Sequence, residues 1–481
     1  MTDRDKLIAR LGDRDSELLA QLDKHYNIDV TDRFLRVLEY HAERFPEDKQ
    51  VIVLKAPGRV NVIGEHLDYN GLPVFPMAID YDMLIALSPR DDRKVIAVNP
   101  EYDDREFEIS PDIPKFDTGD WGNYIKAGVQ GIVDHQGGVE KLKGFNGSFL
   151  GTVPVGSGLS SSSTLVVASA MAVLESSGLG MPPLELADLM ARAEWYVGTQ
   201  GGGMDHAASI LSEKGKALRI GFFPLSARPV ALPAGFTIVV ANSMVVSAKT
   251  EVSRIRFNLL PAACQIACAM MVKTMGLEGE GIERIGDIFF KLGRVETLRG
   301  HERTFTRERY TRHDVAEFLD KPLEEVESTL YTARSGEPLP EPEDGLRIGA
   351  RARHVISEAI RVEESVKVIE AGDGEAFGRR MNGSWISCRD DFEISHPSLE
   401  LLVDFGREAG TSGSRLTGAG WGGCTVHLVA DDKVDTVLAA LKEKYYEDAI
   451  KEFPAAAERY AQRPQDALLA LRPSAGARVL F

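Results

Sequence analysis

The first thirty residues alternate between polar and apolar positions in a way that favours a helix. Four leucines spaced by four, seven and four residues, beginning at Leu7, fall on one helical face among charged neighbours. This pattern predicts a polar amphipathic helix within residues 1–30. A second helix is expected after Thr31, because its hydroxyl can cap the apolar run that follows.

The rest of the chain mixes short apolar runs with longer periodic segments. Runs bounded by Gly and Pro predict strands over 51–54, 73–79, 83–87, 236–246 and 424–429. Longer segments predict helices over 160–174, 184–197, 257–275, 346–370, 399–409 and 438–462. Residues 335–345, with three prolines and four acids, predict a loop or linker. Strands and helices mixed throughout indicate an α/β or α+β protein.

Length and charge narrow the class of protein. A chain of 481 residues usually forms two or three domains and needs no disulfide or metal to hold its core. The formal net charge of −17 argues against general attraction to nucleic acid or anionic membranes, and neither is expected as a partner. Four cysteines make no disulfide framework, and the charged N-terminus lacks the apolar core of a signal peptide. No run approaches 18 apolar residues, so we expect a cytoplasmic protein without a membrane span.

A first glycine cluster lies in the run Pro154–Ser163, between a strand-like segment and the predicted helix from 160. Glycines let backbone N–H groups approach an anion, and a helix start adds unpaired N–H groups. Four successive serines add hydroxyls, so the run is physically suited to hold phosphates, although an ordinary loop is the alternative. No GxxxxGK[ST] motif and no protein-kinase motif set occurs in the chain.

A second cluster, Gly201–Gly203, leads directly into Asp205. Adjacent glycines are tolerated where a ligand must meet bare backbone, and a carboxylate can orient or deprotonate a hydroxyl. The alternative for Asp205 is a cap on a helix that starts near His206. Eleven residues earlier, Glu194 could ligate a metal, or it could be a solvated helix charge.

Two further segments carry a dense polar or glycine-rich pattern. Residues 418–424 (GAGWGGC) require a tight turn or close packing before an apolar strand. Residues 55–71 place Arg, Glu, His, Asp and Asn within one strand-and-turn unit. Such spacing suits a polyhydroxylated ligand, since each hydroxyl needs donors and acceptors, whereas a salt-bridged surface hairpin is the alternative.

Taken together, these segments resemble the GHMP small-molecule kinases and, within them, the galactokinases. The stretch GRVNVIGEHLDYNG is similar to the galactokinase signature GRVNLIGEHTDYNG, and an apolar strand ending in PMAID follows it as in that family. VPVGSGLSSSS is similar to the second family motif and LTGAGWGGCTV to the third, in family order. The resemblance runs from about residue 31 to the C-terminus. It implies an α+β, two-domain fold with mixed sheets and the active site in the cleft between domains. The expected division is a helical extension 1–30, an N-terminal domain 31–235 and a C-terminal domain 236–481.

The resemblance also implies a role for each candidate residue, with ATP and Mg²⁺ as the required small molecules. Asp205 would be the catalytic carboxylate facing the sugar C1 hydroxyl, and Arg59 would offset charge near the transferred phosphoryl group and keep Asp205 ionised. Ser162 and Glu194 would hold Mg²⁺, and Trp121 would lie near the adenine. Residues implied to wrap the ATP phosphates are Gly156, Ser157, Gly158, Leu159, Ser160, Ser161 and Ser162. Residues implied to line the sugar pocket are Glu65, His66, Asp68, Gly202, Gly203 and Phe257.

The expected activity is phosphorylation of galactose at C1, by a protein that we expect to be a monomer. Leu67 replaces the usual Thr of the signature, and Phe257 stands where typical galactokinases have a Tyr that reaches the sugar. Several stretches, including GTQGGGMD and residues 351–362, are more similar to the N-acetylgalactosamine kinase branch, so that activity is an alternative. A non-catalytic sensor of galactose and ATP is a second alternative, although the intact serines and Asp205 argue against it. A kinase for another alcohol such as mevalonate is a third, which the polar GEHLDYNG unit disfavours.

Overall fold

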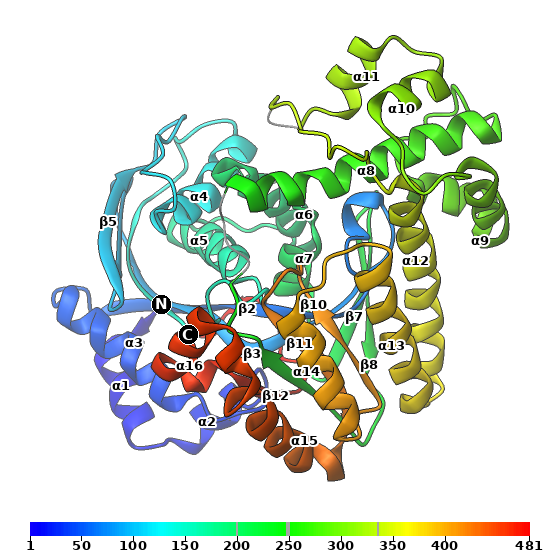
Figure 1. Ribbon diagram of the computed structural model, residues 1–481. Helices are drawn as coiled ribbons and strands as arrows, with labels where there is room; N and C mark the ends of the chain where they lie inside the picture. The colour runs from blue at the N-terminus through cyan, green and yellow to red at the C-terminus, as the bar shows by residue number, and fades with distance from the viewer. Residues whose placement is uncertain (199–200, 247–250, 334–335) are drawn as a thin grey trace.

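A large mixed sheet and a smaller antiparallel sheet organise the computed structural model, which describes residues 1–198, 201–246, 251–333 and 336–481 (Figure 1). The large sheet has the order β1-β2-β3-β6-β4-β5, and β13 pairs with β2 near the C-terminus. Its strand pairs are antiparallel except β4 with β6. The strands are β1 (Thr2–Asp3), β2 (Gln50–Ile63), β3 (Phe75–Pro89), β4 (Lys94–Asn99), β5 (Tyr102–Glu108), β6 (Phe145–Gly151) and β13 (Arg478–Val479).

The smaller sheet has the order β10-β11-β9-β12 and is antiparallel throughout. A separate hairpin is formed by β7 and β8. These strands are β7 (Lys216–Gly221), β8 (Ser226–Ala231), β9 (Phe236–Asn242), β10 (Gly413–Thr417), β11 (Cys424–Ala430) and β12 (Leu468–Leu471).

Helices cover both sheets, and the long α8 runs across one end of the molecule (Figure 1). The first eight are α1 (Arg4–Gly12), α2 (Ser16–Leu22), α3 (Thr31–Arg44), α4 (Gly122–Gln136), α5 (Ser161–Ser177), α6 (Pro183–Ala193), α7 (Met204–Leu211) and α8 (Glu251–Met275). The others are α9 (Ile285–Thr304), α10 (Arg312–Leu319), α11 (Leu323–Leu330), α12 (Ile348–Glu370), α13 (Gly374–Asp390), α14 (Pro397–Glu408), α15 (Val434–Leu441) and α16 (Pro454–Gln462).

The central strands are longer than their apolar runs predict. β2 continues through the polar GRVN stretch, and all its residues after Gln50 are buried. β3 joins the two runs predicted over 73–79 and 83–87 into one strand. Buried polar groups inside these strands, such as Asp82, find partners from neighbouring elements, so polarity alone does not end the strand.

The N-terminal extension differs from the single helix that the leucine spacing predicts. The segment forms α1 and α2, because Asp15 caps a second helix by accepting from Leu18 N at 3.0 Å. The four leucines still share one core with α3 and the strand faces of β2 and β3. The predicted cap at Thr31 is also wrong: Thr31 is the first residue of α3, and its hydroxyl donates to Asp29 at 2.6 Å.

Three later predictions also need comment. The helix predicted over 438–462 is interrupted, because α15 gives way to a π turn at Lys442–Tyr446 and Pro454 starts α16 anew. Residues 336–345 of the proline-rich segment form a loop, whereas 335 lies outside the described residues. One segment of the described chain, Ile255–Met275 of α8, is long and apolar enough to cross a membrane. It packs against α9 and α12, as a core helix does.

Candidate active site

Three glycine-bearing segments that are far apart in sequence meet at one point. Arg59 N, at the start of the signature, donates to Leu159 O at 3.2 Å, and an added Cβ at Gly58 would lie 2.6 Å from that oxygen. A Cβ at Gly418 would lie 3.0 Å from Gly158 O. Side chains at these glycines would hold the backbones apart, so the contact explains why the motifs contain glycine. The turn at 156–160 is thereby fixed by residues inside β2 and by the residue that follows β10.

The turn leads into α5 with its first N–H groups left without a side-chain cap. Ser160, the N-cap, has a left-handed φ of 66°, and its hydroxyl is turned away from the helix. Gly156 and Gly158 also have positive φ values, which a non-glycine residue adopts only with strain. Ser157 Oγ donates to Pro154 O at 2.6 Å and so stiffens the turn, while Ser161 and Ser162 open α5. An uncapped helix start after a glycine turn is a site for phosphate oxygens.

Asp205 lies directly against this turn. Ser160 Oγ donates to one carboxylate oxygen at 2.7 Å, and Arg59 Nη2 lies 2.7 Å from the other. Arg59 also donates to Gly158 O, so it ties the carboxylate to the turn. The capping alternative is wrong, because Gly203 is the N-cap of α7 and Asp205 lies inside its first turn. The side chain is 27% exposed and therefore reachable by a substrate.

Glu194 is mostly buried, so the alternative of a solvated helix charge is wrong. It begins a 3₁₀ turn after α6, and its side chain is only 12% exposed. Its Oε2 accepts from Ser163 Oγ and lies 2.8 Å from His206 Nε2. Burial opposes ionisation, but His206, Ser163 and Ser162 outweigh it and lower the pKa of Glu194. An ionised carboxylate beside serine hydroxyls fits Mg²⁺, which takes one or two carboxylates and leaves other positions to phosphate and water. Within the described ranges no group of three or more His, Cys, Asp or Glu could hold a metal.

Asp68 and the second glycine cluster form one wall beside Asp205. A Cβ at Gly202 would lie 1.9 Å from Asp68 Oδ2, so this carboxylate occupies the space that any other residue would need. Burial, and then the charge of Asp205, raise the pKa of Asp68 to about 6, although Tyr69 N donates to it at 3.0 Å. A side chain at Gly203 would have more room, since the nearest atom to an added Cβ is a ring carbon of Phe222 at 3.3 Å.

His66 is a neutral, buried ring between aromatic neighbours. Burial, and then His354, lower its pKa to about 3. Its Nδ1 lies 3.1 Å from Tyr69 Oη and its Nε2 lies 3.4 Å from Ala419 O. Phe257, in α8, has its ring centroid 6.1 Å from that of His66, so the residue predicted to face the sugar is beside the signature loop.

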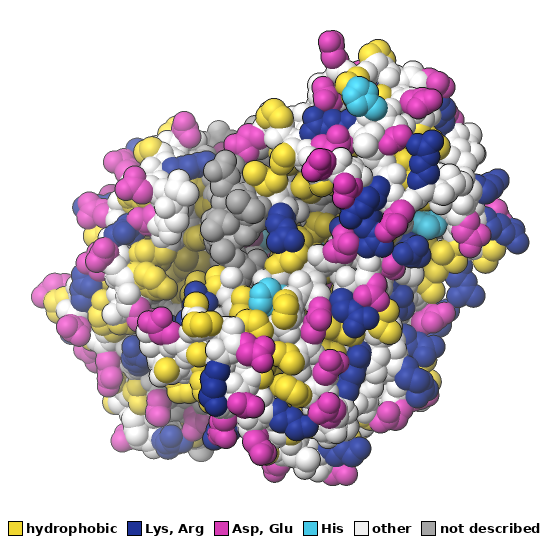
Figure 2. All heavy atoms as spheres, viewed as in Figure 1, with side chains coloured by type: hydrophobic (Ala, Val, Ile, Leu, Met, Phe, Trp, Pro, Cys, Tyr) yellow, Lys and Arg dark blue, Asp and Glu magenta, His cyan; other side chains and the backbone are white. Residues whose placement is uncertain are grey.

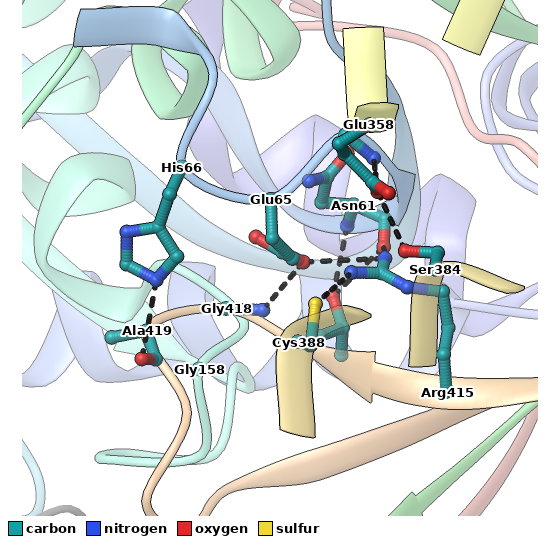
Figure 3. A network of polar contacts seen from close by, with 12 residues as sticks. Asn61, Glu65, His66, Gly158, Glu358, Ser384, Cys388, Arg415, Gly418 and Ala419 are labelled. Atoms are coloured by element: carbon teal, nitrogen blue, oxygen red, sulfur yellow. Dashed lines mark hydrogen bonds and ion pairs between the residues drawn. The ribbon is translucent and has the colours of Figure 1, made fainter. Parts of the chain in front are cut away.

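Glu65 is anchored by the C-terminal half of the chain (Figure 3). Its Oε1 accepts from Gly418 N at 2.9 Å and lies 3.4 Å from Arg415 Nη1. Burial raises the pKa of Glu65, and the Arg415 charge opposes that shift. Arg415 also donates to Asn61 O.

Glu358, on α12, supports the same loop. It accepts from Gly64 N at 2.9 Å and from Ser384 Oγ at 2.6 Å. Arg415 and Glu358 are fully buried and were not singled out from the sequence. No sequence signal marks them, because β10 (GSRLT) is mostly polar and α12 carries charged residues along its whole length.

Trp121 lies at the start of α4, where it is the N-cap residue. Its Nε1 donates to Asp103 O at 3.0 Å, and its ring packs against Tyr102 and Phe149 at 6.0 Å and 5.7 Å between centroids. Figure 2 shows hydrophobic side chains gathered in a hollow on the side of α4 and α5, while acidic and basic groups are interspersed over the rest of that face. The half-buried Trp121 ring is of the kind on which a flat base stacks.

Family models match three parts of the chain. Residues 39–89 match the galactokinase galactose-binding signature, residues 123–213 the GHMP kinases N terminal domain, and residues 365–447 the GHMP kinases C terminal domain. The two GHMP matches support the two-domain α+β architecture expected from the sequence.

Curated relatives and solved structures agree with these matches. A galactokinase of Dictyostelium discoideum is 33% identical over 445 residues, covering 86% of this chain and 88% of the relative. A galactokinase of Candida albicans is 31% identical, covering 92% and 94%. The Lactococcus lactis galactokinase complexed with galactose superposes with a TM-score of 0.71 at 26% identity, covering 92% of this chain and 98% of that one. A mevalonate kinase of Methanococcus jannaschii, 18% identical with a TM-score of 0.54 and covering 82% and 96%, shares the fold.

Proposed function

Because the chain belongs to the galactokinase family of the GHMP kinases, we propose that it transfers the γ-phosphoryl group of ATP to the C1 hydroxyl of galactose. The products are galactose 1-phosphate and ADP. The observation that carries the proposal is the position of Asp205, which touches Ser160 at the start of α5 and Arg59 from the signature strand. A carboxylate so placed can meet a sugar hydroxyl next to a nucleotide's last phosphate.

Asp205 orients the C1 hydroxyl and takes its proton as the sugar oxygen bonds to phosphorus. In the same step the bond from that phosphorus to the bridging oxygen of ADP breaks. Phosphoryl transfer of this kind depends on positioning and charge stabilisation more than on a strong base. Arg59 fits both needs, since its guanidinium donates to Asp205 and to Gly158 O and so faces the turn that would carry the phosphates.

The nucleotide is bound by backbone N–H groups between Gly156 and Ser162, with the adenine beside Trp121. Ser162 and Glu194 hold Mg²⁺ in this proposal, with Ser163 and His206 fixing the Glu194 carboxylate. The ion, when bound, supplies positive charge against the phosphates. Replacing Glu194 by glutamine should therefore weaken Mg²⁺ binding without moving Asp205.

The sugar lies between Asp68, Glu65, His66 and Phe257, with the backbone of Gly202 and Gly203 at its edge. Glu65 and Asp68 accept hydrogen bonds from hydroxyls, and neutral His66 can donate or accept. Phe257 offers no hydroxyl, which leaves one polar group of the sugar without that partner and leaves room beside C2. This observation favours N-acetylgalactosamine as the second candidate substrate.

We propose the domain division 31–235 and 236–481 after the extension 1–30, since the smaller sheet begins with Phe236 in β9. The four cysteines are buried and unpaired, which supports a reducing compartment such as the cytoplasm. A monomer is the proposed state.

An ADP-release assay with Mg²⁺ tests the proposed function. Galactose, N-acetylgalactosamine, glucose and galacturonate are compared at equal concentrations, and kcat/KM is measured for each sugar that turns over. Galactose should give the highest value. A higher value for N-acetylgalactosamine would replace the substrate and keep the reaction. No turnover with any sugar, together with measurable galactose and ATP binding, would favour the non-catalytic sensor.

A further inference from the structure

A cavity of about 150 Å³ lies between α8, the start of α12 and the turn at Trp421. It has no part in the proposed function. It is enclosed by α8, the segment before α10, the end of the proline-rich loop, the start of α12 and the turn around Trp421. Six of its lining residues carry the argument: Arg256, Arg309, Arg347, Arg351, Glu393 and Trp421.

Four guanidinium groups line this cavity against a single lining carboxylate. Glu393 is shared by two of them: its Oε1 lies 2.7 Å from Arg347 Nη1, and its Oε2 is paired with Arg351. Glu308, at the rim, lies 3.6 Å from Arg347 Nε. The two carboxylates leave an excess of positive charge, which stands out in a chain with a formal net charge of −17.

Arg309 and Arg256 also line the cavity. Arg309 Nη1 donates to a carbonyl, Gly345 O, at 3.0 Å. Arg256 lies over the Trp421 ring at 5.5 Å from its centroid. Burial lowers the pKa of Arg351, although Glu393 opposes that shift, so an added anion would stabilise a charge that the protein buries at a cost.

We propose that this cavity binds a small anion that carries a phosphate group. Guanidinium forks bind phosphate oxygens with two parallel hydrogen bonds, and the indole of Trp421 offers a flat apolar wall for a short carbon chain. The cavity volume of about 150 Å³ suits a phosphate group on a short carbon chain. The site is distinct from the α5 N-terminus, where the nucleotide phosphates are proposed to bind.

The cavity shares its walls with the sugar pocket. Arg351 lies over the Phe392 ring at 5.7 Å, and that ring is 4.8 Å from the ring of His66. Trp421 Nε1 donates to Glu393 O at 3.0 Å, within the same turn whose Ala419 O faces His66. An anion in the cavity would therefore act on the residues that support His66.

Calorimetric titration of the full chain with inorganic phosphate tests the site. Excess ADP is present throughout, so that the α5 N-terminus is occupied. The test variant is R256Q/R309Q. The matched control is R294Q/R303Q, which removes two exposed charges of α9 outside the cavity. Thermal midpoints of all three proteins, measured by circular dichroism, verify folding independently of any kinase activity.

The parent and the control should bind phosphate alike, and the test variant at least about tenfold more weakly. No saturable binding to the parent up to roughly 10 mM phosphate, or equal binding by all three folded proteins, would overturn the proposal. A parallel titration with glycerol 3-phosphate identifies the source: tighter binding of the ester indicates a phosphorylated metabolite, and tighter binding of phosphate indicates the free ion. Both outcomes support the site, and neither depends on which sugar the enzyme phosphorylates.

Discussion

Replacing Gly202 by alanine should lower kcat/KM for galactose about 100-fold while leaving KM for ATP nearly unchanged. The backbone permits the substitution, because Gly202 does not have the positive φ that strains other residues. The effect therefore comes from contact alone. An alanine Cβ would lie 1.9 Å from Asp68 Oδ2 and 2.1 Å from its Cγ, whereas ordinary contact begins at 3.4 Å.

The size of the effect follows from that overlap. Asp68 has to move by about 1.5 Å, and misplacing a positioning group by about 1 Å can cost 10²-fold in rate. A 100-fold loss in kcat/KM corresponds to about 2.7 kcal/mol of transition-state stabilisation. The three atoms nearest an added Cβ at Gly202 all belong to Asp68 and none to the turn at 156–162, so ATP binding should be spared.

The assay measures initial rates of ADP release with galactose varied at saturating ATP, and then with ATP varied at saturating galactose. Gly201→Ala is the control, since nothing lies within 4 Å of a Cβ at that position. If G202A and G201A give kcat/KM values for galactose within about threefold of each other, Asp68 does not position the sugar and the assignment is refuted.

Four further predictions follow from the same geometry. Asp205→Ala should lower kcat by several orders of magnitude with nucleotide affinity retained, as measured by single-turnover kinetics and ADP titration; a kcat within about tenfold of the parent would assign the proton to another group. Ser160→Ala removes a 2.7 Å hydrogen bond to that carboxylate and should lower kcat about tenfold, whereas an unchanged kcat would show that Arg59 alone orients it. Since the pKa of Asp68 is about 6 in the free enzyme, its carboxylate gains a proton as the pH falls through 6, and kcat/KM for galactose should fall with it; this inflection should vanish in Asp68→Asn. Arg415→Met leaves buried Glu65 without its cation and should lower the free energy of unfolding by about 3–5 kcal/mol in urea titrations, with Arg415→Lys losing less; equal stability of parent and R415M would contradict the network.

The sequence predicts helices and strands best where one periodic pattern is complete. The helix expected over 346–370 is α12 within two residues at its start, and the strand expected over 424–429 is β11. It predicts worst where tertiary partners override local polarity. β2 runs through Arg59 and Asn61 because other elements satisfy the Arg59 side chain and the Asn61 backbone groups, which no local pattern reveals.

The site shows the same division between motif and surroundings. The glycine turn, Arg59 and Asp205 could be selected from the sequence, because the motifs around them resemble those of the galactokinases. Ser163 and His206, which contact Glu194, could not, because a serine in a run of four and a histidine in a short helix are unremarkable until the fold places them 2.8 Å from its carboxylate. Contacts between distant segments depend on topology, which the spacing of residues within one segment does not predict.

The buried charges of Glu65, Arg415 and Glu358 connect the two sheets at the signature loop. Gly64 and Glu65 directly follow β2 of the large sheet, whereas Arg415 belongs to β10 of the smaller sheet and Glu358 to α12. A buried ion pair adds little net stability over apolar packing, since desolvation offsets its Coulombic attraction. Its value here is geometric: Glu65 Oε1 is held by Arg415 and Gly418 N, which leaves Oε2 for a ligand, and Gly64 N is held by Glu358. The signature loop is thus fixed by residues from the C-terminal half. Asp205 is held by Arg59 and Ser160 of the N-terminal half, and the turn at 156–160 packs against Gly418 of the C-terminal half. Any movement between the two sheets would change the distance from sugar to phosphate, and the Arg415 network opposes that movement.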